Sequence, residues 1–274
     1  MNPVDYRNQT ILVTGASSGI GVAFARALAQ RGANLVLVAR RLDRLETLAA
    51  ELQAAHGIRA TAIKLDLGTS AAGRTLKAAT DDLGLSITGV VNNAGFGTDG
   101  PFHNEDPEKL AEEIAVDIAA LVDISRAFIE PLRAAGTGIL VNVASMAAHQ
   151  PIPGMAVYSA SKAFVLNFTE ALWFESRPTG LRVLALSPGL TSTEFFDVLG
   201  GDLYKGRYET PEQVVQTALT TLDRNRRPSV TSGRSNAFLT SAARLLTRRR
   251  AVMIAASFGN ASGTGELSRV DAVS

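Results

Sequence analysis

A tyrosine and a lysine four residues apart, Tyr158 and Lys162, are the residues of this chain best suited to acid–base chemistry. Side chains at this spacing lie on one face of an α-helix, which places a phenol beside an ammonium group. A nearby positive charge favours the phenolate and lowers the pKa of the tyrosine toward neutral pH. The phenol can then act as a general acid or base. Tyr–Lys pairs with this spacing also occur on helices without a catalytic role. A catalytic role therefore requires further reactive residues near Tyr158 and Lys162.

Ser145 lies thirteen positions before Tyr158, at the end of a predicted strand. A hydroxyl group in that place can hold the oxygen of a substrate beside the phenol. Together with Lys162, these residues predict proton transfer to or from a substrate oxygen.

A glycine-rich turn, TGASSGIG at 14–21, follows the first predicted strand and opens an amphipathic helix. Its glycines allow a sharp turn and a close approach of a pyrophosphate, while the helix N-terminus presents N–H groups and a partial positive charge. The sequence therefore predicts a dinucleotide cradle. Its members are Gly15, Ser17, Ser18, Gly19, Ile20 and Gly21.

Two arginines, Arg40 and Arg41, end the second predicted strand, where an NAD site usually carries an acidic residue for the ribose 2′-hydroxyl. An arginine there can bind a 2′-phosphate instead. Because a charge-assisted hydrogen bond contributes ~1.5–3 kcal/mol, one such contact predicts that NADP(H) is preferred over NAD(H) by roughly ten- to a hundredfold. The alternative is a solvated arginine pair at a helix start. Asp66 and Leu67, after the third strand, are placed for the adenine edge.

Apolar runs alternate with longer amphipathic stretches, which predicts βαβ units around a parallel sheet. We expect a single-domain α/β Rossmann fold: a doubly wound, seven-stranded parallel sheet with helices on both faces. Predicted strands span 10–13, 34–39, 60–64, 89–92, 138–143, 182–187 and 229–231. Predicted helices span 19–31, 41–55, 70–83, 107–135 (bent or broken), 157–177 and 211–223.

Two segments interrupt this alternation within the one domain, 1–274, whose core spans about 9–232. The connection 189–206 has the length and apolar content of a substrate lid. The extension 236–274 is apolar and basic where it begins. It could cover the substrate site, join an oligomer interface or lie on a membrane surface, and a solvated helix end with a frayed tail remains equally open.

Composition excludes several function classes. The formal net charge is +1, from 27 Lys+Arg and 26 Asp+Glu, so nothing indicates a nucleic-acid partner. The chain has no Cys and 3 well-separated His, which predicts no disulfide and no metal site. The first ten residues lack the apolar core of a signal peptide, and no apolar run reaches the ~18 residues of a membrane span. We therefore expect a cytoplasmic protein.

Taken together, these residues resemble the short-chain dehydrogenase/reductase family, over about 9–232. The matching segments are TGASSGIG at 14–21, NNAG at 92–95, Ser145, YSASK at 158–162, and Pro188-Gly189 followed by Thr193. All occur in the family's order and spacing. Arg40 resembles the basic residue of NADP(H)-preferring members. Ala39-Arg40-Arg41 and the basic tail are similar to the branch of broad-specificity ketoacyl and ketosteroid reductases.

The resemblance implies a role for each residue. Tyr158 would be the acid/base, Lys162 would bind the nicotinamide ribose and lower the tyrosine pKa, and Ser145 would orient the carbonyl. Hydride would pass from C4 of the nicotinamide to the carbonyl carbon while Tyr158 protonates the oxygen. Further cofactor contacts would come from Arg40, Arg41, Asp66, Leu67, Asn93, Ala94, Gly95, Pro188, Gly189, Thr191 and Thr193.

One position departs from the family pattern. Asp117 stands where members usually carry an asparagine that completes the catalytic set and a water-linked proton path to the lysine. An ionised aspartate accepts hydrogen bonds but donates none, and it favours a charged lysine. We expect an active enzyme with a shifted pH profile. The alternative is that Asp117 is an ordinary solvated helix residue.

The predicted substrate walls are largely apolar, which favours a hydrophobic ketone, aldehyde or secondary alcohol. They comprise Phe96, Met146, His149, Met155, Phe195 and Phe196. His149 could bind a polar substrate group or be an incidental loop residue. We expect a homodimer or homotetramer that interconverts a carbonyl and a secondary alcohol with NADP(H). The alternative is an NADP(H)-binding sensor on the same fold with little turnover.

Overall fold

Seven short runs of aliphatic and β-branched residues form the strands of the computed structural model, which describes residues 3–195, 208–224, 227–243 and 245–259. The strands are β1 (Thr10–Thr14), β2 (Asn34–Ala39), β3 (Ala60–Lys64), β4 (Gly89–Asn92), β5 (Ile139–Val143), β6 (Arg182–Ser187) and β7 (Ser229–Thr231). All pair in parallel, in the order β3-β2-β1-β4-β5-β6-β7. The order reverses between β1 and β4, and in doubly wound sheets ligands bind at this switch point.

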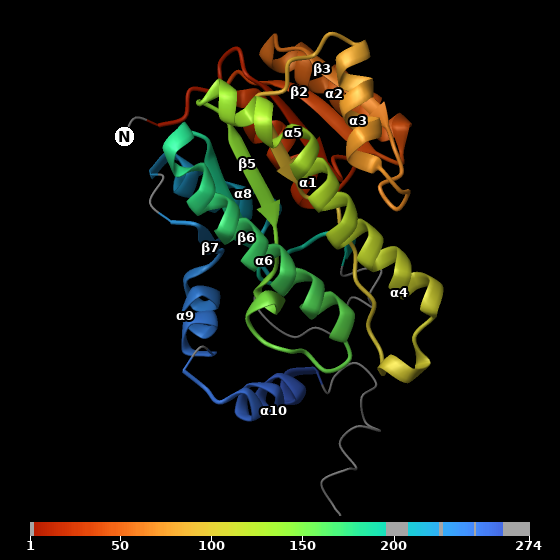
Figure 1. The fold of residues 1–274 in the computed structure, drawn as a ribbon, viewed down its shortest axis with the longest axis vertical. Helices are drawn as coiled ribbons and strands as arrows, with labels where there is room; N and C mark the ends of the chain where they lie inside the picture. The colour runs from red at the N-terminus through yellow and green to blue at the C-terminus, as the bar shows by residue number, and fades with distance from the viewer. Residues whose placement is uncertain (1–2, 196–207, 225–226, 244, 260–274) are drawn as a thin grey trace, which may run out of the picture.

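Helices connect these strands and cover both faces of the sheet (Figure 1). The α-helices are α1 (Gly19–Gln30), α2 (Leu42–His56), α3 (Ala72–Asp82), α4 (Pro107–Ile114), α5 (Leu121–Ala135), α6 (Ala156–Ser176), α8 (Pro211–Arg224), α9 (Arg234–Ala243) and α10 (Arg248–Gly259). Short 3₁₀ turns are η1 (Phe102–Asn104), η3 (Met146–His149) and η4 (Arg177–Thr179). A π-helical segment, η2 (Ala115–Ala120), joins α4 to α5.

The predicted Rossmann fold is confirmed, and the strand boundaries agree with those expected to within one residue. The long helix predicted over 107–135 is interrupted, as expected, and the interruption is the π-helical segment η2. The predicted lid is described only as far as Phe195, and its remaining residues lie outside the described part of the chain.

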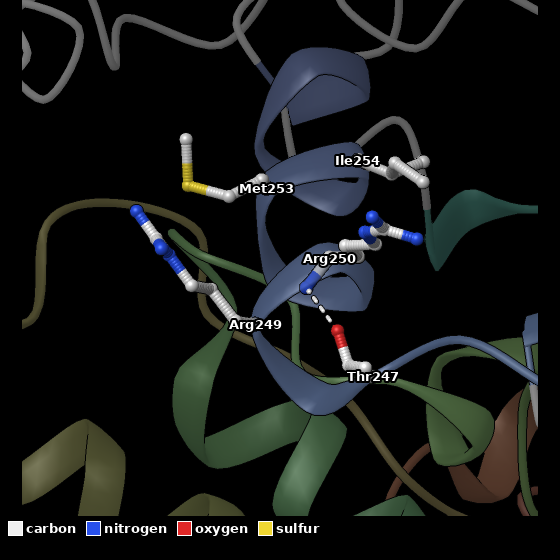
Figure 2. A pocket seen from close by; sticks show the side chains of 5 residues that line it. All are labelled: Thr247, Arg249, Arg250, Met253 and Ile254. Carbon is white, nitrogen blue, oxygen red and sulfur yellow. Dashed lines mark hydrogen bonds between the residues drawn. The ribbon is translucent and has the colours of Figure 1, made fainter.

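The described part of the C-terminal extension contains two helices, α9 and α10. Large apolar side chains on them are exposed, including Phe238 of α9 at 72% and Met253 of α10 at 51%. A surface hollow of about 640 Å³ is lined by Thr247 and by Arg249, Arg250, Met253 and Ile254 of α10 (Figure 2). None of the predicted catalytic residues lines it. Within the described residues, no helix combines the length and apolarity needed to span a bilayer.

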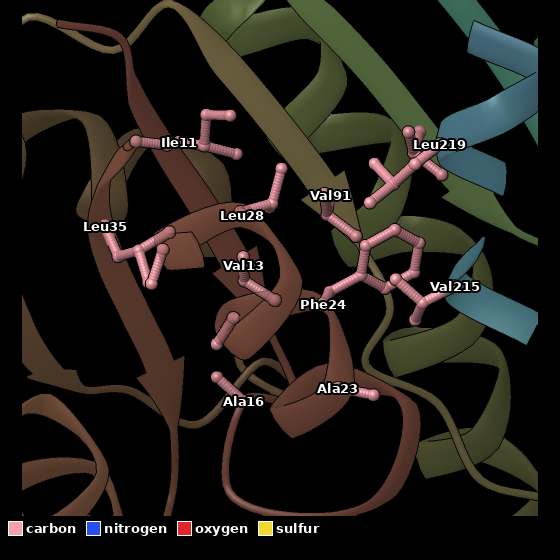
Figure 3. Close-up of a cluster of buried hydrophobic side chains, with 14 of the residues drawn as sticks. Ile11, Val13, Ala16, Ala23, Phe24, Leu28, Leu35, Val91, Val215 and Leu219 are labelled. Atoms are coloured by element: carbon pink, nitrogen blue, oxygen red, sulfur yellow. The ribbon is translucent and has the colours of Figure 1, made fainter. Parts of the chain in front are cut away.

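The core is divided by the sheet into two layers. On one face, Phe24 and Leu28 of α1 and Leu219 of α8 pack on β1, β2 and β4 (Figure 3). On the other face, Phe128 and Leu132 of α5 pack with α3 on the same strands. Because both faces are covered, the strands are mainly apolar, and their carboxyl ends are held in a fixed arrangement.

Candidate active site

The glycine turn after β1 has the backbone geometry of a phosphate cradle. Gly15 and Gly19 have φ values of +65° and +52°, which disfavour residues with a Cβ atom. A Cβ atom added to Gly21 would lie 2.2 Å from the carbonyl oxygen of Gly15. The turn therefore keeps its main chain open at the N-terminus of α1, as a pyrophosphate requires. The backbone at Gly15, Gly19 and Gly21 therefore has the room that a dinucleotide needs.

Thr14 ties this turn to the end of β4. Its Oγ1 accepts hydrogen bonds from the N–H groups of Asn93 and Ala94, both at 3.0 Å. The Asn93 side chain returns a hydrogen bond from Nδ2 to the carbonyl oxygen of Thr14, also at 3.0 Å. The predicted cofactor residues Asn93 and Ala94 thus brace the glycine turn at the switch point. Sequence reasoning missed Thr14, although it opens the recognised motif.

Arg40 and Arg41, the two residues predicted to bind the 2′-phosphate, contact different parts of the structure. Arg41 donates to Ser17 Oγ from Nε at 3.2 Å and from Nη2 at 3.0 Å, so its guanidinium lies on the glycine turn. Arg40 is exposed and pairs with Glu112 of α4 at 3.4 Å. Of the two, Arg41 is placed directly against the cradle.

Glu194 links the start of the predicted lid to α2. Its carboxylate pairs with Arg41 at 2.9 Å and with Arg44 at 2.6 Å. Hydrogen bonds from Arg44 and Arg41 lower the pKa of Glu194 below its usual value. These contacts join residues 150 and 153 positions apart and have no local sequence signal, so sequence reasoning missed them.

The remaining predicted cofactor residues also border the cradle or the sheet edge. A Cβ atom on Gly19 would lie 2.9 Å from Cγ2 of Thr193, so the segment after β6 reaches the glycine turn. The Thr191 hydroxyl donates to the Gly189 carbonyl at 3.0 Å. Asp66 is exposed after β3, where its Oδ1 accepts from the Gly68 N–H at 2.9 Å.

Tyr158, Lys162 and Ser145 converge at the carboxyl end of the sheet. All three are at least 90% buried. The Lys162 ammonium lies 5.5 Å from the centroid of the Tyr158 ring, as the spacing on α6 predicts. Ser145 follows β5, and its Oγ accepts from the N–H of Ala147 at 3.1 Å to start η3. Hydrogen bonding with Ser145 also acts to lower the pKa of Tyr158.

Asp117 belongs to this group rather than to the solvated surface. Its side chain is fully buried, with Oδ2 2.9 Å from the Lys162 ammonium. Oδ1 accepts from the backbone N–H of Phe96 at 3.1 Å. A Cβ atom on Gly95 would lie 2.8 Å from Oδ1 of Asp117 and 2.9 Å from the lysine Nζ, so the turn after β4 covers the ion pair closely. Lys162 therefore has a buried carboxylate as its partner.

The net pKa shift of Tyr158 is opposite to the shift expected from sequence. Burial raises the pKa of the phenol, while Lys162 and Ser145 act to lower it. The charges of Asp117 and Glu113 raise it further. Lys162 thus has the expected effect, but desolvation and two carboxylates outweigh it. The sequence-based argument counted the cation and omitted its anionic partner.

Glu113 is a second buried carboxyl that sequence reasoning missed. It is fully buried on α4, one helical turn before Asp117, and its Oε2 accepts from Thr98 N at 3.1 Å and from Thr98 Oγ1 at 3.0 Å. Burial raises the pKa of Glu113 to about 7. Its i,i+4 spacing from Asp117 was a usable signal, because it places both carboxyls on one helix face.

The predicted substrate residues gather partly around Tyr158. The ring of Phe195 lies 5.4 Å from that of Tyr158, and Met155 packs in the same buried cluster. A Cβ atom on Gly97 would lie 2.9 Å from Cδ2 of Tyr158. Phe96, Met146 and His149 are half-buried, in the turn after β4 and in η3. Phe196 lies outside the described residues.

Comparison with known proteins agrees with this arrangement. Residues 9–202 match the family model for short chain dehydrogenases. Sulfoacetaldehyde reductase 2 of Chromohalobacter salexigens is 37% identical over 195 residues, covering 70% of this chain and 77% of that protein. The 7beta-hydroxysteroid dehydrogenase of Collinsella aerofaciens is 30% identical over 230 residues, covering 82% and 86%.

Among solved structures, a short-chain dehydrogenase from Sphingobium yanoikuyae in complex with NADPH superimposes with a TM-score of 0.76 at 32% identity. The match covers 86% of this chain and 94% of the other. Strands β1 to β6, with the glycine turn, and the helix α6 that carries Tyr158 fall within the family match. We conclude that the chain belongs to the short-chain dehydrogenase/reductase family and is an oxidoreductase that acts on CH–OH and C=O groups with a nicotinamide cofactor.

Proposed function

We propose that the protein is an NADP(H)-dependent carbonyl reductase or secondary-alcohol dehydrogenase in which Tyr158 is the general acid/base. The observation that carries this proposal is the buried Tyr158 phenol beside the Lys162 ammonium, 5.5 Å from the ring centroid, at the sheet edge that holds the glycine cradle. The NADPH complex of the Sphingobium protein and the reductase and dehydrogenase names of the relatives support it.

The residues divide the chemistry between them. A bound nicotinamide supplies or accepts a hydride at the carbonyl carbon. Ser145 holds the substrate oxygen, and Tyr158 gives that oxygen a proton in reduction or removes it in oxidation. Lys162 stabilises the phenolate left after proton donation. Burial of all three excludes bulk water, which strengthens these electrostatic effects.

Asp117 fixes the position and charge of Lys162. The paired carboxylate raises the pKa of Lys162 against the opposing effect of burial, so the lysine stays protonated. Removing one partner of a buried ion pair leaves an uncompensated charge, which costs roughly 3–5 kcal/mol. In this proposal Asp117 takes the place of the family's asparagine without stopping turnover.

We further propose that NADP(H) is preferred over NAD(H). Arg41 lies on the glycine turn through Ser17, and Arg40, which directly follows β2, is exposed. A 2′-phosphate would meet the Arg41 guanidinium, which Glu194 and Ser17 already orient. The exposed Arg40 is paired with Glu112, so its charge reaches a phosphate only when that surface ion pair opens.

The substrate we propose is a hydrophobic ketone, aldehyde or secondary alcohol. Phe195, Met155 and Ile152 form an apolar cluster with the ring of Tyr158. A substrate whose oxygen meets Ser145 and Tyr158 would place its substituents against this cluster. We also propose a homo-oligomer, because the exposed apolar side chains of α9 and α10 would be covered by association.

The test is the consumption of NADPH and NADH, measured in parallel, against aliphatic, aromatic, ketoacyl-thioester and steroid carbonyls. We expect turnover with NADPH and an NADPH preference of roughly ten- to a hundredfold in kcat/KM. Equal use of the two cofactors would contradict the arginine assignment. Tight NADPH binding with no turnover on any carbonyl would favour the alternative of an NADP(H) sensor.

A further inference from the structure

The arginine that lies on the glycine turn also has an acidic partner. Arg41 donates to Ser17 Oγ from Nε at 3.2 Å and from Nη2 at 3.0 Å, and its Nη1 donates to Glu194 Oε2 at 2.9 Å. Each guanidinium nitrogen therefore has an oxygen partner. A 2′-phosphate that binds Arg41 must share this guanidinium with the Glu194 carboxylate.

Arg44 holds the other oxygen of the same carboxylate. Its Nη1 donates to Glu194 Oε1 at 2.6 Å, from the first turn of α2. Hydrogen bonds from Arg44 and Arg41 lower the pKa of Glu194, so this carboxylate is ionised at neutral pH. The two arginines and Glu194 together carry one net positive charge, whereas the two arginines alone would present two.

The backbone on both sides of Glu194 is anchored at the proposed cofactor site. Thr193 lies against the glycine turn, because a Cβ atom on Gly19 would lie 2.9 Å from its Cγ2. The ring of Phe195 lies 5.4 Å from that of Tyr158. The carboxylate of Glu194 therefore stays beside the arginines at the start of α2.

Glu194 has two opposite effects on phosphate binding. It orients the Arg41 guanidinium, but the two hydrogen bonds to Ser17 orient this group without it. Exposed ion pairs such as Arg41–Glu194, with 39% and 48% of the side chains exposed, hold a side chain only weakly. The negative charge of Glu194 repels a dianionic phosphate at the same guanidinium, and this repulsion acts over several ångströms even in water. The charge effect therefore outweighs the orienting effect.

We propose that Glu194 is a specificity-determining residue that limits the preference for NADP(H) over NAD(H). This inference rests on the proposed binding of the 2′-phosphate by Arg41. The carboxylate offsets part of the positive charge that the phosphate would meet, whereas the uncharged 2′-hydroxyl of NAD(H) loses nothing by its presence. The enzyme therefore discriminates between the two cofactors less sharply than Arg41 and Arg44 would make it do alone.

The test is the Kd of NADPH and of NADH, measured by fluorescence titration without substrate, in wild type and Glu194→Gln. The amide oxygen of glutamine still accepts a hydrogen bond from Arg41, but the side chain carries no charge. We expect the variant to bind NADPH roughly three- to tenfold more tightly at low salt, with the Kd of NADH unchanged. The gain should shrink in about 1 M salt, where charges are screened. An NADPH affinity that is unchanged or reduced in the variant, or a gain that persists at high salt, would overturn the proposal.

Glu51→Gln is the matched control. Glu51 forms an exposed ion pair with Arg26 at 3.0 Å and lies on the same helix, α2. It follows Arg41 by ten residues, which places it about 15 Å further along the helix. We expect both Kd values to match those of wild type. An equal gain in NADPH affinity in this control would assign the effect to overall charge and would also contradict the proposal.

Three results separate this inference from the proposed function. If wild type prefers NADPH and Glu194→Gln binds both cofactors as wild type does, the inference alone is rejected. If neither protein prefers NADPH, the assignment of Arg41 is rejected and the inference with it. Tighter NADPH binding by the variant, without turnover of any carbonyl, supports the inference and rejects the proposed catalysis.

Discussion

The phenol of Tyr158 is buried, and the buried ammonium of Lys162 lies next to it. Tyr158→Phe removes the proton while changing little volume. We expect kcat to fall at least about a hundredfold, the usual contribution of a general acid, with the NADPH Kd unchanged. Single-turnover kinetics and fluorescence titration of NADPH measure the two effects. Loss of NADPH binding together with turnover would contradict this division of roles.

A second prediction concerns Asp117, whose charge affects the pKa of the other buried carboxyl, Glu113. Asp117→Asn removes the partner of Lys162 and leaves Glu113 as the nearest carboxyl of the cluster. Because the charge of Asp117 raises the pKa of Glu113, the variant should lower that pKa. We expect turnover within about tenfold of wild type and a pH profile shifted accordingly.

Asp117→Leu is the control, because it has a similar volume but no polar contact with Lys162 or with the Phe96 N–H. We expect it to lose stability and turnover together. A hundredfold rise in turnover for Asp117→Asn would show instead that the native aspartate impairs the site.

Sequence reasoning predicted the reacting side chains but not their electrostatic balance. Ser145, Tyr158 and Lys162 were predicted from their types, their spacing and a family resemblance, and the structure brings them together. The spacing of Glu113 from Asp117 could have placed both carboxyls on one helix face, but the burial of Glu113 depends on how α4 packs against α6, which the sequence pattern does not give. The sign of the tyrosine shift was wrong for the same reason, since it depends on desolvation and on a carboxyl 45 residues earlier in the chain.

The helices α3 and α5 are held in close contact by a glycine. A Cβ atom on Gly73 would lie 2.3 Å from the backbone carbonyl of Asp123, and the Gly73 N–H donates to the Asp123 carboxylate at 2.7 Å. We expect Gly73→Ala to lower the free energy of unfolding by about 1–3 kcal/mol, as overpacking does, with little effect on the NADPH Kd. Urea unfolding measures the loss.

Gly57→Ala is the matched control for this packing effect. Gly57 has a φ of +66° and nothing within 4 Å of an added Cβ atom, so only backbone strain is expected there, of about 1–2 kcal/mol. If both variants retain wild-type stability, then neither the contact between α3 and α5 nor the left-handed backbone limits stability.

The ends of helices and strands were predictable where the hydrophobic pattern stops at a glycine or a polar turn residue. The strands are continuous apolar runs that end at glycine or polar turns, so their ranges matched closely. For the C-terminal extension no helix boundaries were predicted, and the structure has two helices there, α9 and α10. An interruption of the helix predicted over 107–135 was expected. Its π-helical form was not, because amino-acid composition does not show which backbone groups hydrogen-bond to each other.

For the whole molecule, the buried carboxyl of Glu113 predicts pH-dependent stability. Its pKa is raised from 4.5 to about 7, so the folded protein binds this proton more tightly than the unfolded chain does. The favourable contribution is complete below about pH 4.5 and is lost as the pH rises through 7. By linkage, the loss amounts to up to about 3 kcal/mol.

Urea unfolding of wild type and Glu113→Gln at pH 5 and pH 8 measures this loss. Comparing the variants cancels the other titrating groups. We expect the advantage of wild type at pH 5, relative to Glu113→Gln, to shrink or reverse at pH 8. A constant difference between the two proteins would contradict the raised pKa.

The π-helical segment η2 has a consequence for how this chain can tolerate change. Asp117 lies within this segment and pairs with Lys162, and Glu113 precedes it on α4, while Ile124 and Phe128 of α5 pack in the sheet core. Each helical residue contributes a rotation of about 100°. Deleting one residue from η2 would therefore rotate α4 by about a quarter turn relative to α5, moving both carboxyls out of alignment while the core contacts persist. The π-helical segment therefore lets the carboxyls of α4 and η2 face one direction while the apolar residues of α5 face the core.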